Sequence, residues 1–209
     1  MNRHHQLLWR SVKGGLFFLL GLLLATNAVA WSLTLGAASR RVFLHVGNGT
    51  QNASNGQINL VSVAVGATVL GNGALQAMTS NSGQAASLYD GFQTCPTPAS
   101  QVLVGASYQR SNAADGPSSA SLRVTTPASL TSAAGDVIPF GQISWTVSAP
   151  GSSQPNVIPA GTFSGGTQAL AMVQANTYVE NCHSFGYANA QIVPSGTYNG
   201  RATYTLSSP

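Results

Sequence analysis

Residues 58–65 read Ile-Asn-Leu-Val-Ser-Val-Ala-Val, a stretch in which large apolar residues alternate with polar or small ones. Successive side chains of a β-strand point to opposite faces, so this two-residue period predicts a strand with one buried face. Residues 31–35 alternate in the same way. Four further stretches, bounded by turn-forming residues, are strand candidates: residues 41–46, 101–108, 120–125 and 137–148.

The connectors between these stretches favour antiparallel pairing. They are rich in turn-forming residues, as at Gly71-Asn72-Gly73, and Pro127 and Pro139 mark strand ends or edges because proline cannot donate to a ladder. Outside the first thirty residues no stretch keeps the period of a helix. Residues 74–94 carry a weak signal that fits a short helix or a long loop. The sequence therefore predicts an all-β fold, either an antiparallel β-sandwich or a barrel.

A short motif occurs twice near the end of the chain. Residues 158–165 read IPAGTFSG, residues 193–200 read VPSGTYNG, and both copies continue to a leucine, Leu170 or Leu206. Proline followed two residues later by glycine favours a tight turn, and the threonine–aromatic pair then begins a strand. Two copies fit either an internal duplication or one local turn that is used twice, and they are too few for a solenoid.

The first thirty residues have the layout of a secretory signal peptide. Basic residues precede an apolar run over residues 15–25, and Ala28-Val29-Ala30 follows as a small-residue cleavage site. The run is shorter than the ~20 residues that a membrane-spanning helix needs. We therefore expect residues 1–30 to be cleaved and residues 31–209 to form a single exported domain with no membrane span, located in the periplasm, on the cell surface or outside the cell.

The net positive charge of the chain lies mostly in the predicted signal peptide. In residues 31–209 five arginines face four carboxyl groups, so the formal net charge of this part is +1. A basic patch that could bind nucleic acid or anionic lipid is therefore not expected. With 44% hydrophobic residues in the whole chain, the composition is also too apolar for a disordered protein.

The two cysteines, Cys95 and Cys182, both lie in the predicted exported part. Export through an oxidising compartment favours a disulfide between them, and the alternative is two free buried thiols. Their spacing does not match a zinc site.

Candidates for catalysis are few. Glu180-Asn181-Cys182-His183 invites the interpretation of a cysteine nucleophile activated by histidine, but a disulfide would consume that thiol. Glu180 and His183 could supply two metal ligands on a helix, whereas on a strand they would point to opposite faces; the expectation is a solvent-exposed pair beside the disulfide. Only His45 and His183 titrate near neutrality in residues 31–209. We expect no enzyme activity, no cofactor and no metal site.

Two features leave a binding role open. Asn48-Gly49-Thr50 and Asn52-Ala53-Ser54 match the glycosylation acceptor pattern, which occurs by chance in a chain of this composition. Several aromatic residues could stack on sugar rings, but packing in a sandwich is the stronger expectation: these are Trp31, Trp145, Tyr108, Tyr178, Tyr187 and Tyr204.

The end of the chain resembles a family of bacterial proteins. Val193-Pro194-Ser195-Gly196-Thr197-Tyr198, followed by residues 201–206 (RATYTL), resembles the closing strand of fimbrial and spore-coat-U-like subunits, which often read Pro-x-Gly-x-Tyr before an alternating strand. The step Ile138-Pro139-Phe140 is similar. These motifs cover about the last fifth of the chain, and residues 31–209 as a whole also resemble a group of uncharacterised exported bacterial proteins.

This resemblance implies a pilin-like fold, an incomplete immunoglobulin-like sandwich that a strand from a neighbouring subunit completes. Trp31, Leu33 and Leu35 then become the candidate donor strand, which would bind through main-chain hydrogen bonds and alternate pockets. The expected function is a non-catalytic structural subunit, fimbria- or pilus-like, whose partners are like subunits or a periplasmic chaperone and usher. The alternatives are a stand-alone adhesin for glycan or protein, using loops 50–56 and 81–92, and, ranked last, a small secreted hydrolase that depends on His183.

Overall fold

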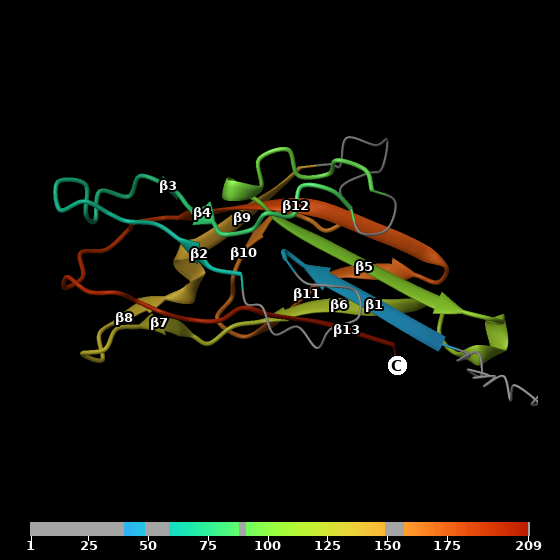
Figure 1. Cartoon of the computed structure of the whole chain (residues 1–209). Helices are drawn as coiled ribbons and strands as arrows, with labels where there is room; N and C mark the ends of the chain where they lie inside the picture. The colour runs from blue at the N-terminus through green and yellow to red at the C-terminus, as the bar shows by residue number, and fades with distance from the viewer. Residues whose placement is uncertain (1–39, 49–58, 88–90, 149–156, 209) are drawn as a thin grey trace, which may run out of the picture. The chain divides into compact units, whose positions relative to one another are not determined.

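Strand β12, Thr177–Tyr187, is the longest strand of the described structure and lies at the centre of its larger sheet. The computed structural model (Figure 1) describes residues 40–48, 59–87, 91–148 and 157–208. All of them belong to the second of two units into which the chain divides, Met1–Ala37 and Ala38–Pro209. The predicted signal peptide, residues 1–30, and the candidate donor strand, residues 31–35, lie outside the described residues.

The larger sheet has six strands, and all its pairings are antiparallel. Its order is β1-β5-β12-β9-β10, and β3 pairs with the end of β12. The other bounds are β1 Arg40–Val46, β3 Gln76–Ala77, β5 Val102–Arg110, β9 Ile143–Ser148 and β10 Gly161–Thr162.

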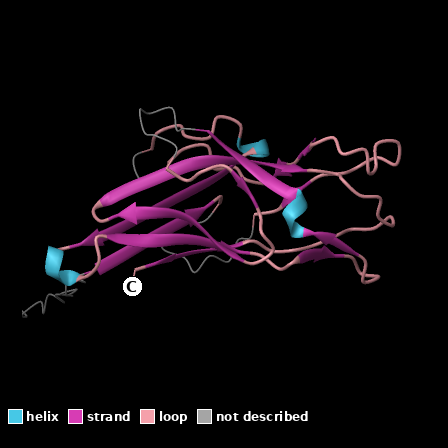
Figure 2. Ribbon diagram, turned by 180° about the vertical axis from the view of Figure 1, so that it is seen from behind, coloured by secondary structure: helices cyan, strands magenta, loops and turns pink. Residues whose placement is uncertain are grey.

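The smaller sheet has three strands in the order β11-β6-β13, also antiparallel. Their bounds are β6 Ser119–Thr125, β11 Thr167–Gln174 and β13 Thr203–Ser207. Two short ribbons pair β2 Val61–Ser62 with β4 Thr79–Ser80, and β7 Ser129–Thr131 with β8 Val137–Pro139. Three short 3₁₀ helices complete the elements of the described residues (Figure 2), and they are η1 Pro98–Ser100, η2 Ala113–Asp115 and η3 Phe140–Gln142.

One hydrophobic core contains side chains of both the six-stranded sheet and the three-stranded sheet. Tyr108 of β5 and Trp145 of β9 belong to the same buried cluster as Leu122 of β6 and Val173 of β11. Full burial of a large apolar side chain contributes about 1.5–3 kcal/mol, so this shared cluster is the main stabilising feature of the fold. A second, smaller cluster holds Leu103 with Cys95 and Cys182, on the other side of the larger sheet from that core.

The all-β, antiparallel prediction is confirmed, and most predicted strands are present. Residues 41–46, 101–108 and 120–125 became β1, β5 and β6. Residues 137–148 form β8, η3 and β9 instead of one strand, and Pro139 ends β8 as the missing donor predicts.

The stretch that predicts the fold most clearly forms little sheet. In residues 58–65 only Val61–Ser62 joins a ladder, yet exposure still alternates along residues 60–65. The valines at 61, 63 and 65 pack on the core, so the alternation reports a half-buried extended segment rather than a long paired strand. Residues 74–94 contain β3, β4 and an isolated bridge between Ala86 and Gln93.

Two of the longer strands, β11 and β12, were not predicted from the sequence, and neither were the short strands β3, β4 and β7. Strand β12 is buried on both faces along Glu180–His183, so its sequence does not alternate. Strand β11 contains a bulge between Ala169 and Ala171 that shifts its register by one residue and breaks its alternation.

The two copies of the repeated motif precede two strands, β11 and β13, that occupy equivalent positions on either side of β6 in the smaller sheet. The leucines that follow the two copies, Leu170 in β11 and Leu206 in β13, lie on the two strands that flank β6. Thr167 and Thr203 are both register partners of Thr125, one from each side. The two copies therefore feed two strands that run parallel to each other with β6 between them.

Candidate functional site

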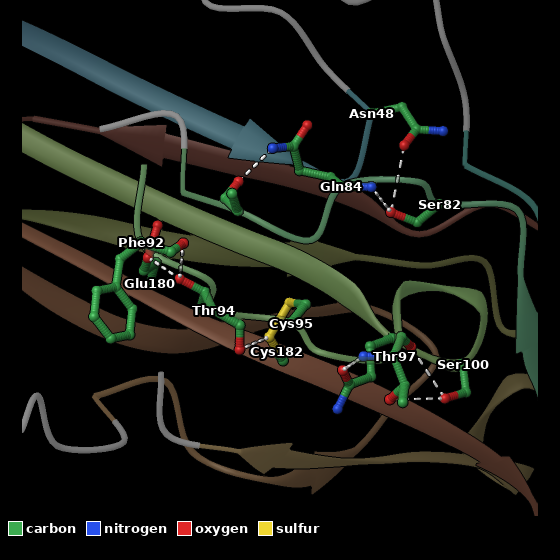
Figure 3. Close-up of a disulfide and its surroundings, with 12 residues drawn as sticks. Asn48, Ser82, Gln84, Phe92, Thr94, Cys95, Thr97, Ser100, Glu180 and Cys182 are labelled. Atoms are coloured by element: carbon green, nitrogen blue, oxygen red, sulfur yellow. Dashed lines mark hydrogen bonds between the residues drawn. A yellow bond between two sulfur atoms is a disulfide. The ribbon is translucent and has the colours of Figure 1, made fainter. Parts of the chain in front are cut away.

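The predicted disulfide is present. Cys95 and Cys182 are bonded, with Cα atoms 5.6 Å apart, and both are fully buried. Cys182 lies in β12, whereas Cys95 belongs to the segment of residues 91–97 that crosses the outer face of the larger sheet (Figure 3). The bond fastens this segment to the sheet and removes the thiol that the nucleophile interpretation required.

A buried carboxyl group lies next to the disulfide. Glu180 is 8% exposed, and its two oxygens accept hydrogen bonds from Thr94 Oγ1 at 2.5 Å and Tyr178 Oη at 2.5 Å. Thr94 is adjacent to Cys95 in the covering segment, and Tyr178 lies two residues before Glu180 on the same face of β12. A buried carboxyl group without partners would be strongly destabilising, so these two hydroxyls are what permits Glu180 to lie beneath the segment.

Glycine at position 105 makes room for this arrangement. Register places Gly105 of β5 opposite His45 of β1 on one side and opposite Glu180 of β12 on the other. A Cβ at position 105 would lie 2.4 Å from the Tyr178 hydroxyl. The missing side chain therefore allows the Tyr178 phenol to lie over β5 while it donates to Glu180. We call Thr94, Tyr178 and Glu180, with His45, the outer-face cluster.

His45 is buried in this cluster at 3% exposure, and its Nε2 has no hydrogen-bond partner. Burial lowers the pKa of His45 below its ordinary value, although a hydrogen bond with the Gly47 backbone and the nearby Glu180 oppose the shift. A general acid or base must lie within hydrogen-bond reach of its substrate. His45 and Glu180 are both buried, and the hydrogen bond from Thr94 to Glu180 ties the disulfide-bonded segment to the sheet.

His183 corrects the expectation of a solvent-exposed pair. Glu180 and His183 are both buried, and the strand sends them to opposite faces of the sheet because an odd separation changes face. His183 packs among aromatic rings of the core, stacked on Trp145 at 6.3 Å and edge-on to Tyr204 at 6.4 Å. Neither ring nitrogen has a hydrogen-bond partner, and burial lowers the pKa of His183 to about 4.

Three other candidate residues make packing or hydrogen-bond contacts within the fold. Tyr108 and Trp145 are buried in the core, where they donate hydrogen bonds to the carbonyls of Pro117 and Pro159. Asn48 of the first glycosylation pattern accepts from the Gly83 amide and donates to the Asn81 carbonyl. Asn52 and loop 50–56 lie outside the described residues, as do residues 88–90 of loop 81–92. In the part of the chain that the structure describes, no three histidine, cysteine, aspartate or glutamate side chains lie together as metal ligands would.

The smaller sheet presents two edges in the described residues, β11 and β13, and they differ. Neither strand contains a charged residue or proline, the residues that commonly protect an edge from further pairing. The bulge in β11 interrupts its ladder, whereas β13 pairs with β6 in unbroken register from Thr203 to Ser207. By contrast, β1 at the edge of the larger sheet begins with Arg40 and Arg41. Strand β13 is therefore the regular, uncharged edge, a feature that the sequence analysis missed because sheet order is not visible in sequence.

No family model matches the chain, and neither a curated protein nor a solved structure matches it. Among the described residues, no helix has the length and apolar character needed to cross a membrane.

Proposed function

We propose that this protein is a non-catalytic structural subunit of an exported, fimbria-like assembly. In this proposal the two larger sheets form a pilin-like, immunoglobulin-like β-sandwich that is incomplete at β13. Residues 31–35 of a neighbouring copy add to that edge as a donor strand. Like subunits are the permanent partners, and a periplasmic chaperone and usher are the partners during export to the cell surface.

The observation that carries the proposal is the chemistry of the β13 edge. Soluble proteins usually protect sheet edges with lysine, proline or a bulge, and β13 has none of these. Its Tyr204 and Leu206 side chains pack on the core while Thr203, Thr205 and Ser207 are exposed. A donor in which Trp31, Leu33 and Leu35 alternate with polar residues would continue the same inner face by strand addition.

The burial of the titratable groups supports a non-catalytic role. His183, on which the hydrolase interpretation depends, is packed among aromatic side chains. His45 and Glu180 are buried, and Glu180 is bonded to Thr94 of the disulfide-bonded segment. The same disulfide is compatible with export through an oxidising compartment.

Light scattering coupled to size-exclusion chromatography tests the assembly. The exported protein should form concentration-dependent oligomers, because a donor strand that adds to a different acceptor edge makes a head-to-tail contact, which can extend into a filament. The full chain without residues 31–36 should be monomeric, and less stable because its groove is empty. A protein that stays monomeric at all concentrations with and without this deletion would refute strand exchange.

A pair of lysine substitutions tests the acceptor edge. Thr203→Lys places a charge on β13, and Thr125→Lys places the same charge beside it on the central strand β6, since the two threonines are exposed register partners. We expect the first variant to reduce oligomer formation by at least about tenfold and the second to leave it within about twofold. Equal effects of the two variants would show that the edge is not the contact.

A further inference from the structure

An open pocket of about 540 Å³ lies between the turn that joins β7 to β8 and the second copy of the repeated motif. Its lining includes hydroxyls from Thr131, Ser132, Ser195 and Thr197 and an amide from Asn199, while most of the accessible lining surface is apolar. Gly196 and two alanines form the rest. The volume lies within the range of about 300–1,000 Å³ that small-molecule sites occupy.

The lining is suited to a neutral ligand that carries many hydroxyl groups. Each hydroxyl and the amide can both donate and accept a hydrogen bond, and none of the lining residues is charged. The nearest carboxyl group in the sequence is Asp136, whose Oδ2 accepts from Ser132 Oγ at 3.4 Å and whose amide donates to the same Oγ at 3.1 Å. A carboxyl group held against the lining disfavours anionic ligands.

The two copies of the motif use their glycine differently. In the first copy a Cβ at Gly161 would lie 2.8 Å from the Trp145 ring, so packing requires glycine there. In the second copy a Cβ at Gly196 would meet only Ser132 Cβ at 3.7 Å and Tyr198 Cε2 at 3.9 Å, which are ordinary contacts. A side chain at position 196 would therefore not clash with its neighbours, so packing does not require glycine there. Gly196 lines the pocket.

Backbone hydrogen bonds hold both walls of the pocket in place. Thr131 and Asn199 exchange amide-to-carbonyl bonds of 2.9 and 3.0 Å, and the Tyr198 hydroxyl donates to the Pro194 carbonyl at 2.8 Å. Val137 lies directly opposite Thr131 in the ribbon and is 52% exposed. Directly opposite residues share one face of a ribbon, so Val137 adds an exposed apolar surface beside the hydroxyls.

We propose that this pocket binds a neutral saccharide unit. The sugar's hydroxyl groups would exchange hydrogen bonds with Ser195, Thr197 and Asn199, and its C–H face would pack on the apolar part of the lining, which includes Ala133 and Ala134. A preformed site of this kind reduces the ordering that binding requires. The inference does not depend on strand exchange, since it concerns β7, β8 and the loop before β13 rather than the edge of β13.

Saturation-transfer difference NMR on the exported protein tests this site, with the methyl glycosides of glucose, galactose, mannose and N-acetylglucosamine as probes. Because Gly196 has an ordinary φ and a Cβ there would make only ordinary contacts, Gly196→Leu should fill the pocket without disturbing the fold. Gly166→Leu is the matched control, because nothing lies within 4 Å of a Cβ there and the residue is outside the pocket.

We expect at least one neutral glycoside to bind with a millimolar Kd, corresponding to about −4 kcal/mol. The Gly196→Leu variant should weaken that binding at least about tenfold, while the Gly166→Leu variant keeps it. Binding that survives Gly196→Leu, binding only of the anionic probe sialyllactose, or no saturable binding up to ~50 mM would each overturn the assignment.

Discussion

At the residue scale, His183 is a titratable side chain placed where its charged form is strongly disfavoured. Its neighbours are the rings of Trp145, Phe185 and Tyr204, and burial also raises the pKa of the Tyr204 hydroxyl above its usual range. The neutral imidazole therefore serves as a packing group of the core. Protonation would place an unpaired charge among aromatic rings.

The first prediction concerns the dependence of stability on pH. The pKa of His183 is about 4 in the folded protein, against an ordinary value of 6.5, so below pH 6.5 the unfolded chain binds more protons. The free energy of unfolding should therefore fall as pH decreases from 6.5 to 4, by about 3 kcal/mol from His183 alone. Burial lowers the pKa of His45 as well, so its contribution has the same sign.

Urea unfolding at pH 7, 5.5 and 4.5, followed by tryptophan fluorescence, measures this dependence. In the His183→Phe variant, which keeps an aromatic ring at the site, the loss of stability toward low pH should be reduced by most of that amount. An unchanged pH dependence in this variant would show that His183 does not control it.

The second prediction concerns the outer-face cluster. Gly105→Ala should displace the Tyr178 hydroxyl and remove one donor from Glu180, which we expect to destabilise the protein by about 1–2 kcal/mol. Gly83→Ala is a control with similar loss of backbone freedom, because its Cβ would have nothing nearer than 4.0 Å. Urea unfolding of both variants measures the difference.

A double-mutant comparison separates the contact from the backbone effect. Tyr178→Phe removes the same hydroxyl without adding a Cβ, so Gly105→Ala should cost less in the Tyr178→Phe background than in the native protein. Additive effects would mean that the destabilisation arises elsewhere.

At the scale of the elements, the disulfide joins a segment that has little regular structure to the longest strand. Residues 91–97 reach β12 through the Cys95–Cys182 bond and the hydrogen bond from Thr94 to Glu180, and the Cys95 amide donates to the Ala85 carbonyl. The bond closes a loop of 87 residues in sequence separation. Such a loop restricts the unfolded chain strongly, because closure entropy grows with loop length.

The third prediction is that removal of this bond destabilises the protein by about 4 to 5 kcal/mol, as the chain-entropy estimate for such a loop gives. The Cys95→Ala/Cys182→Ala variant, measured by urea unfolding, tests the magnitude. In this variant the backbone amide of residue 95 should exchange its hydrogen faster than in the native protein. The backbone amides in the middle of the β5–β12 ladder should stay protected. Equal protection of both regions in the variant would contradict the role of the disulfide as the tie for this segment.

At the scale of the whole molecule, stability rests on apolar burial and hydrogen bonding rather than on charge. Residues 31–209 carry only five arginines and four carboxyl groups, and among them Glu180 is bonded to neutral hydroxyls. Screening by salt acts on interactions between charges, so it has few targets in this protein.

The fourth prediction follows from this small number of charges. The free energy of unfolding at pH 7 should change by less than about 0.5 kcal/mol between ~50 mM and ~300 mM sodium chloride. Guanidinium would itself change the ionic strength, so urea is the appropriate denaturant. A change of several kcal/mol would show that ionic interactions are a major part of the stability.

The sequence by itself determined the features that depend on local patterns. Strand-like composition between turn-rich connectors identified β1, β5 and β6, Pro139 marked the end of β8, and the small number of cysteines left one possible disulfide. The alternation of valines at 61, 63 and 65 also predicted which side chains pack on the core, although few of those residues pair. These features are readable because each depends on the residues within one segment.

Only the tertiary structure decided what depends on contacts between distant segments. Burial of Glu180 and His183 on opposite faces of β12, the glycine gap at position 105, and the order that leaves β13 at an edge all require neighbours far away in sequence. A strand buried on both faces has no alternation to reveal it, so the central strand of the larger sheet was the least visible in the sequence. The pocket at Gly196 likewise arises only because the turn between β7 and β8 comes to lie against the second copy of the repeated motif.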